Sequence, residues 1–251
     1  MRIFYTLLKK ELRAFFYSPV AYVVLALVMI LNGFSFRAAI EVMARVPQPG
    51  SIVTMTFNSQ WFWLSYFFIF PLLTMRLFAE ERKLGTWETL FTAPVRTWQV
   101  LGSKYLASVI FYCLLWVPSM ANFAIFQTMT DGAAEVPVGA LLGTYLLIFV
   151  MGLFNLAVGC FASSLTSNQI VAAVLSFTIS LLHFLVGIFI IHLRRIADSF
   201  VDLAYYIATM EHIRVFINGL LDTRPLIYYG SLSALFLFFT HQVLEFRRWR
   251  V

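Results

Sequence analysis

Six long apolar runs, separated by short polar or charged segments, dominate this sequence. A hydrocarbon core about 30 Å thick requires about 20 apolar residues in a helix. Only 12% of the 251 residues are charged, too few to cover the surface of a soluble domain of this length. We therefore predict an all-α integral membrane protein with helical spans at residues 20–36, 57–78, 100–128, 138–163, 169–193 and 226–244.

Lysine and arginine are distributed unequally between the two sets of connecting segments. Twelve of the 18 lie on the side that carries both termini, and six lie on the opposite side. Because cytoplasmic loops are enriched in Lys and Arg, we predict a multi-pass protein of the bacterial inner membrane with both termini in the cytoplasm. The basic residues thus orient the protein, and they do not indicate a nucleic-acid partner.

The N-terminal segment, residues 1–17, is too short and too charged to span. Plotted at about 100° per residue, it has a broad apolar face and an opposite basic face, and Glu11 is the exception to this division. We predict an amphipathic helix along the cytoplasmic interface, followed by a turn at Ser18 and Pro19 into a six-helix domain at residues 18–251. A simple lipid anchor and a docking role fit this helix equally well.

A second cytoplasmic element is predicted between the second and third spans, where a charged start leads to a short helix at about residues 86–93. Gly85 permits a break after the span, and Thr86 suits the N-cap. Glu88 suits the first helical turn, and Pro94 ends the element.

One face of this short helix is apolar, because Trp87, Leu90 and Phe91 follow the i, i+3, i+4 spacing. A helix of about two turns is unstable in isolation, so its apolar face must pack against another surface. The sequence alone allows two partners, a groove on another protein or the lipid headgroup region.

On the opposite side, residues 194–225 are too long for a turn and too charged to span. Apolar residues recur among the charges, and Asn218 with Gly219 marks a stop. We predict one or two amphipathic helices that rest in the outer interface. A passive cap is the favoured interpretation, and a role in substrate handling is the alternative.

Several kinds of chemistry are absent from the sequence. Lys104 follows Gly102 and Ser103, but the glycine and spacing of a phosphate-binding loop are missing, so we predict no ATP hydrolysis and no bound cofactor. The spans lack a buried acid that could bind a coupling ion. His183 lies in mid-span, where a hydrogen bond to a neighbouring helix is favoured over a proton relay. We expect the same of Asn32 and Asn155, and we interpret the two cysteines as packing residues without a metal.

Three stretches resemble the ABC-2 type permeases, most closely the branch of the gliding-motility permease and its copper-maturation relatives. They are LLKKELRAFFYSP near the N-terminus, FPLLTMRLFAEERKLGTWETLFTAPV at residues 70–95, and GLLDTRPLIYYGSLSALFLFFT at residues 219–240. The middle stretch is fairly specific, whereas the apolar spans are not.

The resemblance implies a non-catalytic permease subunit that exports an amphipathic lipid, a polysaccharide or a drug-like compound. Two permease copies, identical or paralogous, would bind a dimer of cytoplasmic ATPases, which hold the ATP and Mg. Residues 1–17 correspond to the connecting helix of the family and residues 86–93 to its coupling helix. The implied ATPase-coupling residues are Glu80, Glu81, Arg82, Gly85, Thr86, Trp87, Glu88, Leu90 and Phe91.

Two alternatives stay open. The chain could transmit ATP-driven motion to an extracytoplasmic accessory protein without transporting anything, or it could be an ATP-independent carrier. Repeats of small residues four apart could bring two copies together through close helix contact, or they could pack within one subunit. These residues are Gly139 and Gly143, and Ala172, Ser176 and Ser180.

Overall fold

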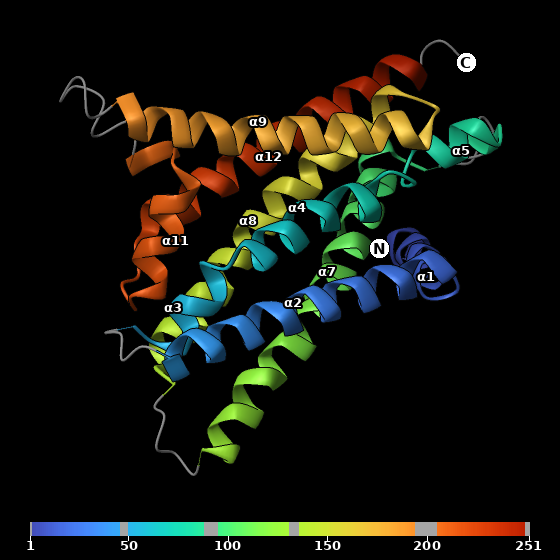
Figure 1. The fold of residues 1–251 in the computed structure, drawn as a ribbon. Helices are drawn as coiled ribbons and strands as arrows, with labels where there is room; N and C mark the ends of the chain where they lie inside the picture. The colour runs from blue at the N-terminus through green and yellow to red at the C-terminus, as the bar shows by residue number, and fades with distance from the viewer. Residues whose placement is uncertain (1, 46–49, 88–94, 131–135, 194–204, 249–251) are drawn as a thin grey trace.

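The computed structural model describes residues 2–45, 50–87, 95–130, 136–193 and 205–248, and in these ranges every regular element is a helix (Figure 1). This confirms the predicted all-α class. The helices are α1 (Arg2–Phe16), α2 (Pro19–Arg45), α3 (Ile52–Phe57), α4 (Gln60–Thr74), α5 (Ala79–Lys83), α7 (Thr97–Met129), α8 (Val138–Leu165), α9 (Gln169–Leu193), α11 (Thr209–Ile217) and α12 (Thr223–Arg248).

Within the described ranges, six helical stretches are long and apolar enough to cross a membrane, as predicted. Five are the single helices α2, α7, α8, α9 and α12, and the sixth is Gln60–Lys83, which contains α4 and α5. The main difference from the prediction is that α2 continues to Arg45, well beyond residue 36.

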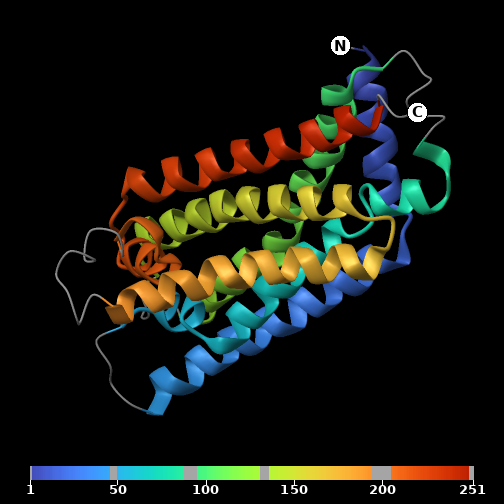
Figure 2. The ribbon, with the colours of Figure 1, turned by 90° about the horizontal axis from the view of Figure 1, so that it is seen from above.

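The spans form an inner and an outer group. Most residues in the apolar parts of α8 and of the Gln60–Lys83 stretch are buried, whereas only a minority are buried in α2, α9 and α12. The helix α8 packs against α12, α9, α4, α11 and α7. Figures 1 and 2 place α1, α5 and the end of α12 at one end of the bundle, and α3 and α11 at the other.

The short helix α3 was not predicted. Ser51 caps its start by accepting a hydrogen bond from the backbone N–H of Thr54 at 3.2 Å. Phe57 at its end is buried, with ring centroids 5.1 Å from Phe62 and 5.6 Å from Tyr145. The helix α3 therefore closes the aromatic core at this end of the bundle.

The predicted outer interfacial region is only partly described, because residues 194–204 lie outside the described ranges. In the described part, α11 packs on the bundle with one face and exposes Arg214 on the other. Its residues Ile213, Phe216 and Ile217 are buried, and the helix packs against α8 and α9. The apolar face of α11 contacts protein, and the predicted position of this region in the outer interface stays a prediction.

Small residues four apart also face the interior. Ala172, Ser176 and Ser180 of α9 are all buried within the chain. A Cβ added to Gly143 would lie 3.1 Å from the side chain of Leu221. At these four positions the small residues pack within one subunit, whereas Gly139 is exposed.

Two of the three predicted hydrogen bonds between spans are confirmed. The Asn155 amide donates to the Tyr66 hydroxyl at 3.0 Å, joining α8 to α4. The His183 Nε2 atom lies 2.9 Å from the Tyr228 hydroxyl, joining α9 to α12. The prediction for Asn32 is wrong, because its amide donates to a carbonyl of its own helix.

Candidate functional site

The candidate site lies at the end of the bundle that carries α1 and α5. Here α1 packs along the first half of α7, where the Phe15 ring stacks on Phe111 with centroids 5.3 Å apart and Phe4 stacks on Trp98 at 6.4 Å. Gly102 permits this close approach, since a Cβ there would lie 3.3 Å from the Phe4 ring. Part of the apolar face of α1 therefore binds the chain itself.

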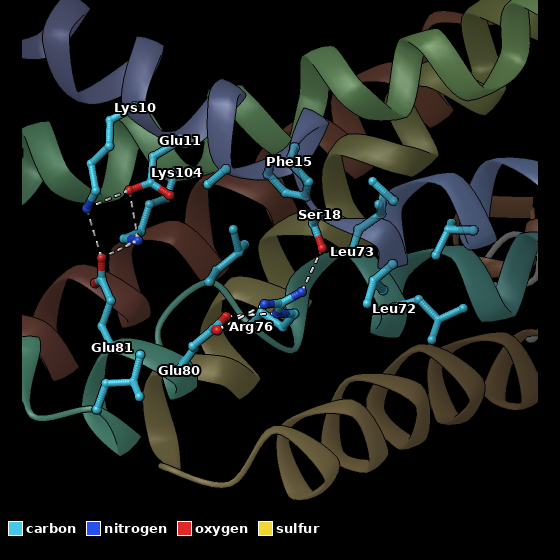
Figure 3. Close-up of a pocket in the computed structure, with 16 residues that line it drawn as sticks. Lys10, Glu11, Phe15, Ser18, Leu72, Leu73, Arg76, Glu80, Glu81 and Lys104 are labelled. Carbon is cyan, nitrogen blue, oxygen red and sulfur yellow. Dashed lines mark hydrogen bonds and ion pairs between the residues drawn. The ribbon is translucent and has the colours of Figure 1, made fainter.

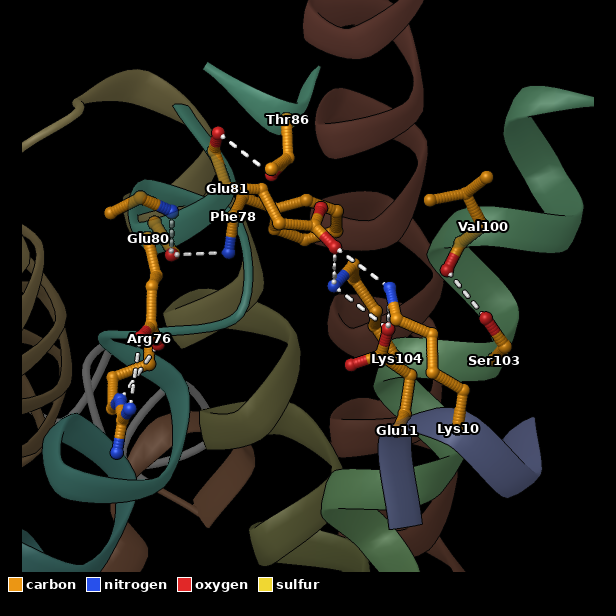
Figure 4. Close-up of polar contacts among 12 residues, drawn as sticks. Lys10, Glu11, Arg76, Phe78, Glu80, Glu81, Thr86, Val100, Ser103 and Lys104 are labelled. Carbon is orange, nitrogen blue, oxygen red and sulfur yellow. Dashed lines mark hydrogen bonds and ion pairs between the residues drawn. The ribbon is translucent and has the colours of Figure 1, made fainter. Parts of the chain in front are cut away.

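A buried lysine of α7 faces α1 and α5. The Lys104 Nζ atom lies 3.1 Å from Glu11 Oε1 and 2.9 Å from Glu81 Oε1, and only 3% of its side chain is exposed (Figure 4). Lys10 lies on the outer side of the same carboxylates, with its Nζ 3.5 Å from each. We call these four residues, Lys10, Glu11, Glu81 and Lys104, the charge cluster.

The charge cluster joins three separate elements. Glu11 belongs to α1, Glu81 to α5 and Lys104 to α7. A buried ammonium group is unfavourable unless counter-charges compensate for its lost hydration, and the two carboxylates do so here. This explains why Glu11 interrupts the apolar face of the amphipathic helix.

A second ion pair stands beside the charge cluster, at the end of the second span. The Arg76 guanidinium binds the Glu80 carboxylate through two hydrogen bonds, at 2.8 and 2.9 Å. Its remaining terminal nitrogen donates to the Ser18 hydroxyl at 2.8 Å (Figure 3). The paired geometry holds the turn between α1 and α2 against the start of α5.

The other side of α5 is attached to the end of α8. The Ser163 hydroxyl accepts hydrogen bonds from the backbone N–H groups of Phe78 and Ala79, both at 3.1 Å. These groups begin α5 and have no partner within their own helix. Arg82 donates to the Ser164 carbonyl at 3.4 Å. The segment thus contacts α1, α7 and α8 together.

The structure describes the chain as far as Trp87. Gly85 adopts the left-handed backbone region with φ of +70°, which explains the glycine at the break. The prediction that Thr86 is the N-cap is wrong, because its backbone is already helical and its hydroxyl donates to the Glu81 carbonyl at 3.2 Å. Trp87 is 7% exposed and its ring centroid lies 6.2 Å from that of Phe78.

Trp87 therefore lies in the interior of the chain and not on an exposed ridge. Glu88, Leu90 and Phe91 fall outside the described residues, so the remainder of the predicted coupling helix stays a prediction. The structure does attach the charged residues that lead to it. Glu81 pairs with Lys104 of α7, Arg82 donates to the Ser164 carbonyl of α8, and Glu80 pairs with Arg76 at the end of its own span.

Several residues of the site were not predicted as site residues, among them Lys10, Glu11, Arg76, Lys104 and Ser163. Two of them carried a signal in the sequence. Glu11 breaks the amphipathic pattern of its helix, and Lys104 lies inside the start of the predicted span at residues 100–128. A charge in an apolar setting indicates a buried partner, but the sequence does not say which.

A second polar cluster lies at the opposite end of the bundle. His212 of α11 hydrogen-bonds the Tyr229 hydroxyl at 3.0 Å and the Tyr205 carbonyl at 3.0 Å, and Tyr229 also contacts Thr209 at 3.1 Å. Burial lowers the pKa of the His212 imidazole below its usual value, although its bond to the Tyr205 carbonyl acts in the opposite direction. The cluster fixes α11 to α12.

A comparison with known families supports a family assignment. Residues 39–240 match the family model described as ABC-2 family transporter protein. The match begins within α2 and ends within α12, so it contains α5 and the start of α7, whereas α1 and Glu11 precede it. A comparison with curated proteins gives no match.

Proposed function

This chain belongs to the ABC-2 family of transporter proteins, and from that premise we propose that it is the permease subunit of an exporter driven by a separate cytoplasmic ATPase. The family and the six apolar helices make the chain a multi-pass membrane subunit of an ABC transporter. The proposal adds two permease copies, two ATPase subunits that bind ATP and Mg, and an amphipathic cargo. It places the complex in a bacterial inner membrane, with both termini in the cytoplasm.

The observation that carries the proposal is the position of α5. This helix lies directly before residues 86–93, and it is held to α1 and α7 by the charge cluster and to α8 by Ser163. A displacement of residues 86–93 would therefore act on three helices and on the second span at once. Such an arrangement suits a subunit that receives mechanical work from a partner.

In this proposal the residues of the site have different tasks. Leu90 and Phe91 contact the ATPase, and Glu88 supports their helix. Glu80, Glu81 and Arg82 transmit the motion, and Gly85 allows the turn between the two parts. Trp87 and Thr86 fix the start of the coupling helix to the chain, since Trp87 is buried there.

The test is a reconstituted complex of the permease and its ATPase. Glu81→Gln should preserve assembly and basal ATP hydrolysis but strongly reduce cargo-stimulated hydrolysis and export, because the charged link between α5 and α7 is weakened. Glu41→Gln is the matched control, since Glu41 pairs with Arg37 in an exposed contact at 3.0 Å on α2. Exposed pairs contribute about 0–1 kcal/mol, so the control should behave as wild type.

Three outcomes would contradict the proposal. Export without the ATPase would favour an ATP-independent carrier. ATP hydrolysis that no cargo stimulates, together with motion passed to an extracytoplasmic protein, would favour the non-transporting assembly. Wild-type coupling of ATP hydrolysis to export in Glu81→Gln would show that the charged contacts of α5 do not transmit the motion of the ATPase.

A further inference from the structure

Two arginines meet at the end of α8. Arg82 of α5 donates to the Ser164 carbonyl at 3.4 Å, and Arg247 of α12 donates to the Leu165 carbonyl at 3.0 Å. Because the two acceptors are successive residues, both guanidinium groups lie at the same helix terminus. Figures 1 and 2 place the ends of α8 and α12 at the end of the bundle that carries α5. We call Arg82 and Arg247 the arginine pair.

Among the described residues, neither member of the arginine pair has a carboxylate within ion-pair distance. The sequences of α8 and α9 contain no acid. The two acids of α5 already bind Arg76 and Lys104, and Glu245, the acid of α12, lies 3.9 Å from His241. The four helices that meet at this point therefore leave the positive charge of the arginine pair uncompensated.

The two guanidinium groups are close enough for the charge of Arg82 to disfavour that of Arg247. Both side chains are half-buried, where an uncompensated charge is unfavourable. Each group uses one nitrogen to cap α8, and a guanidinium has five N–H donors. The unbonded nitrogens are open to solvent. Capping therefore explains only part of the arrangement, and the remaining donors can bind an anion.

Exposed apolar side chains of the spans adjoin the arginine pair. Phe239 and Phe246 lie seven residues apart on one face of α12, just before Arg247, and both are exposed. Leu165 at the end of α8 is exposed as well. These side chains belong to helices that are long and apolar enough to cross a membrane. The arginine pair therefore lies where the hydrocarbon of the membrane meets the lipid headgroups.

We propose that the arginine pair binds the phosphate of an anionic phospholipid from the leaflet on the side of the termini. The phosphate oxygens accept the free N–H donors, and an acyl chain lies along Phe239. An anionic headgroup supplies the negative charge that the four helices lack, whereas a zwitterionic headgroup brings a cation of its own. The exposed apolar neighbours favour a lipid over an acidic protein segment. The inference goes beyond the proposed function, because it involves no ATPase.

The experiment is native mass spectrometry of the purified permease, titrated with phosphatidylglycerol or with phosphatidylcholine of identical acyl chains. Wild type should prefer phosphatidylglycerol roughly thirtyfold, the effect of two cations beside an anionic lipid. Arg247→Gln should lower this preference roughly fivefold, the effect of one cation, while its amide can still donate to the Leu165 carbonyl. Arg248→Gln is the matched control, because the same change at the exposed next residue should preserve the preference.

A soluble phosphate tests the acyl-chain contact. Glycerol 3-phosphate at the concentration of the lipid should not displace phosphatidylglycerol, because it has no hydrocarbon to lie along Phe239. Displacement by this compound would show that the arginine pair binds a free anion, and it would overturn the proposal.

Thermal unfolding of each variant in detergent identifies any loss of lipid that comes from misfolding, and Arg82→Gln then carries the test. Equal retention of the two lipids by wild type, or an equal loss of preference in Arg247→Gln and Arg248→Gln, would overturn the proposal. A wild-type lipid preference in Arg247→Gln, together with weaker binding of the purified ATPase, would also overturn it and assign the arginine pair to an acidic protein segment.

Discussion

Removing the charge of Lys104 would leave two largely buried carboxylates with only the exposed ammonium of Lys10, 3.5 Å from each. Breaking a buried ion pair typically costs about 3–5 kcal/mol. We therefore expect Lys104→Met to lower the free energy of unfolding in detergent by about 3–5 kcal/mol, measured by chemical unfolding. Lys10→Met is the control, and its exposed pair predicts a loss of about 0–1 kcal/mol. Similar losses of unfolding free energy in the two variants would contradict the burial of Lys104 in the charge cluster.

Gly159 allows α4 and α8 to approach closely. A Cβ at this position would lie 2.6 Å from Cγ2 of Thr74, a fully buried side chain that cannot move aside freely. Gly159→Ala is expected to lower the thermal stability in detergent by the equivalent of about 1–3 kcal/mol, because the two helices must separate. Gly33→Ala on α2 meets nothing within 4 Å and should be stabilising by about 0.5–1 kcal/mol. A stable Gly159→Ala variant would contradict the packing of α4 on α8.

Individual residues also show how far sequence reasoning extends. The hydrogen bonds of Asn155 and His183 to other helices follow from the cost of an unpaired polar group in hydrocarbon. The same argument failed for Asn32, because a carbonyl one turn earlier in α2 satisfied its amide. Glu11 and Lys104 could be identified as unusual, but their contact joins positions 93 residues apart and depends on how α1 lies on α7.

At the scale of elements, length and apolar content predicted every span. Short helices were harder. The six residues of α3 are too few for a hydropathy signal, and their burial depends on Phe57 meeting aromatic side chains of distant spans. The amphipathic pattern of α11 was visible, but an apolar face looks the same in sequence whether it meets lipid headgroups or α8.

The element at residues 86–93 yields a prediction that separates folding from docking. Trp87 is buried in the chain, so Trp87→Ala should destabilise the permease by about 3–5 kcal/mol even without the ATPase. Phe91→Ala should leave that stability unchanged and weaken ATPase binding by about 2 kcal/mol, as loss of an aromatic anchor does. Unfolding in detergent measures the first effect, and affinity for the purified ATPase measures the second. If Phe91→Ala binds the ATPase with wild-type affinity, the prediction that this segment contacts the ATPase is wrong.

At the scale of the whole molecule, the inner helices can be distinguished from the outer ones only in the structure. All spans are apolar, yet most residues of α8 are buried, whereas only a minority are buried in α2, α9 and α12. The sequence does not distinguish lipid contact from contact with a second copy, since both favour apolar side chains. The small residues of α9 give no interface, because they face inward. A permease dimer would have to use other residues of the exposed spans.

The orientation of the whole bundle is the last prediction. Six spans place α1 and the end of α12 on one side, and the twelve Lys and Arg residues there predict that this side is cytoplasmic. In a background with Cys113 and Cys160 replaced by Ala, we introduce Asn218→Cys, directly after α11, or Thr86→Cys, shortly after α5, and both positions are exposed. Figure 1 places α11 and α5 at opposite ends of the bundle. A membrane-impermeant thiol reagent added outside intact cells should modify position 218 and spare position 86 until the membrane is opened. The reverse labelling would invert the topology and place the charge cluster outside, where a cytoplasmic ATPase could not reach it.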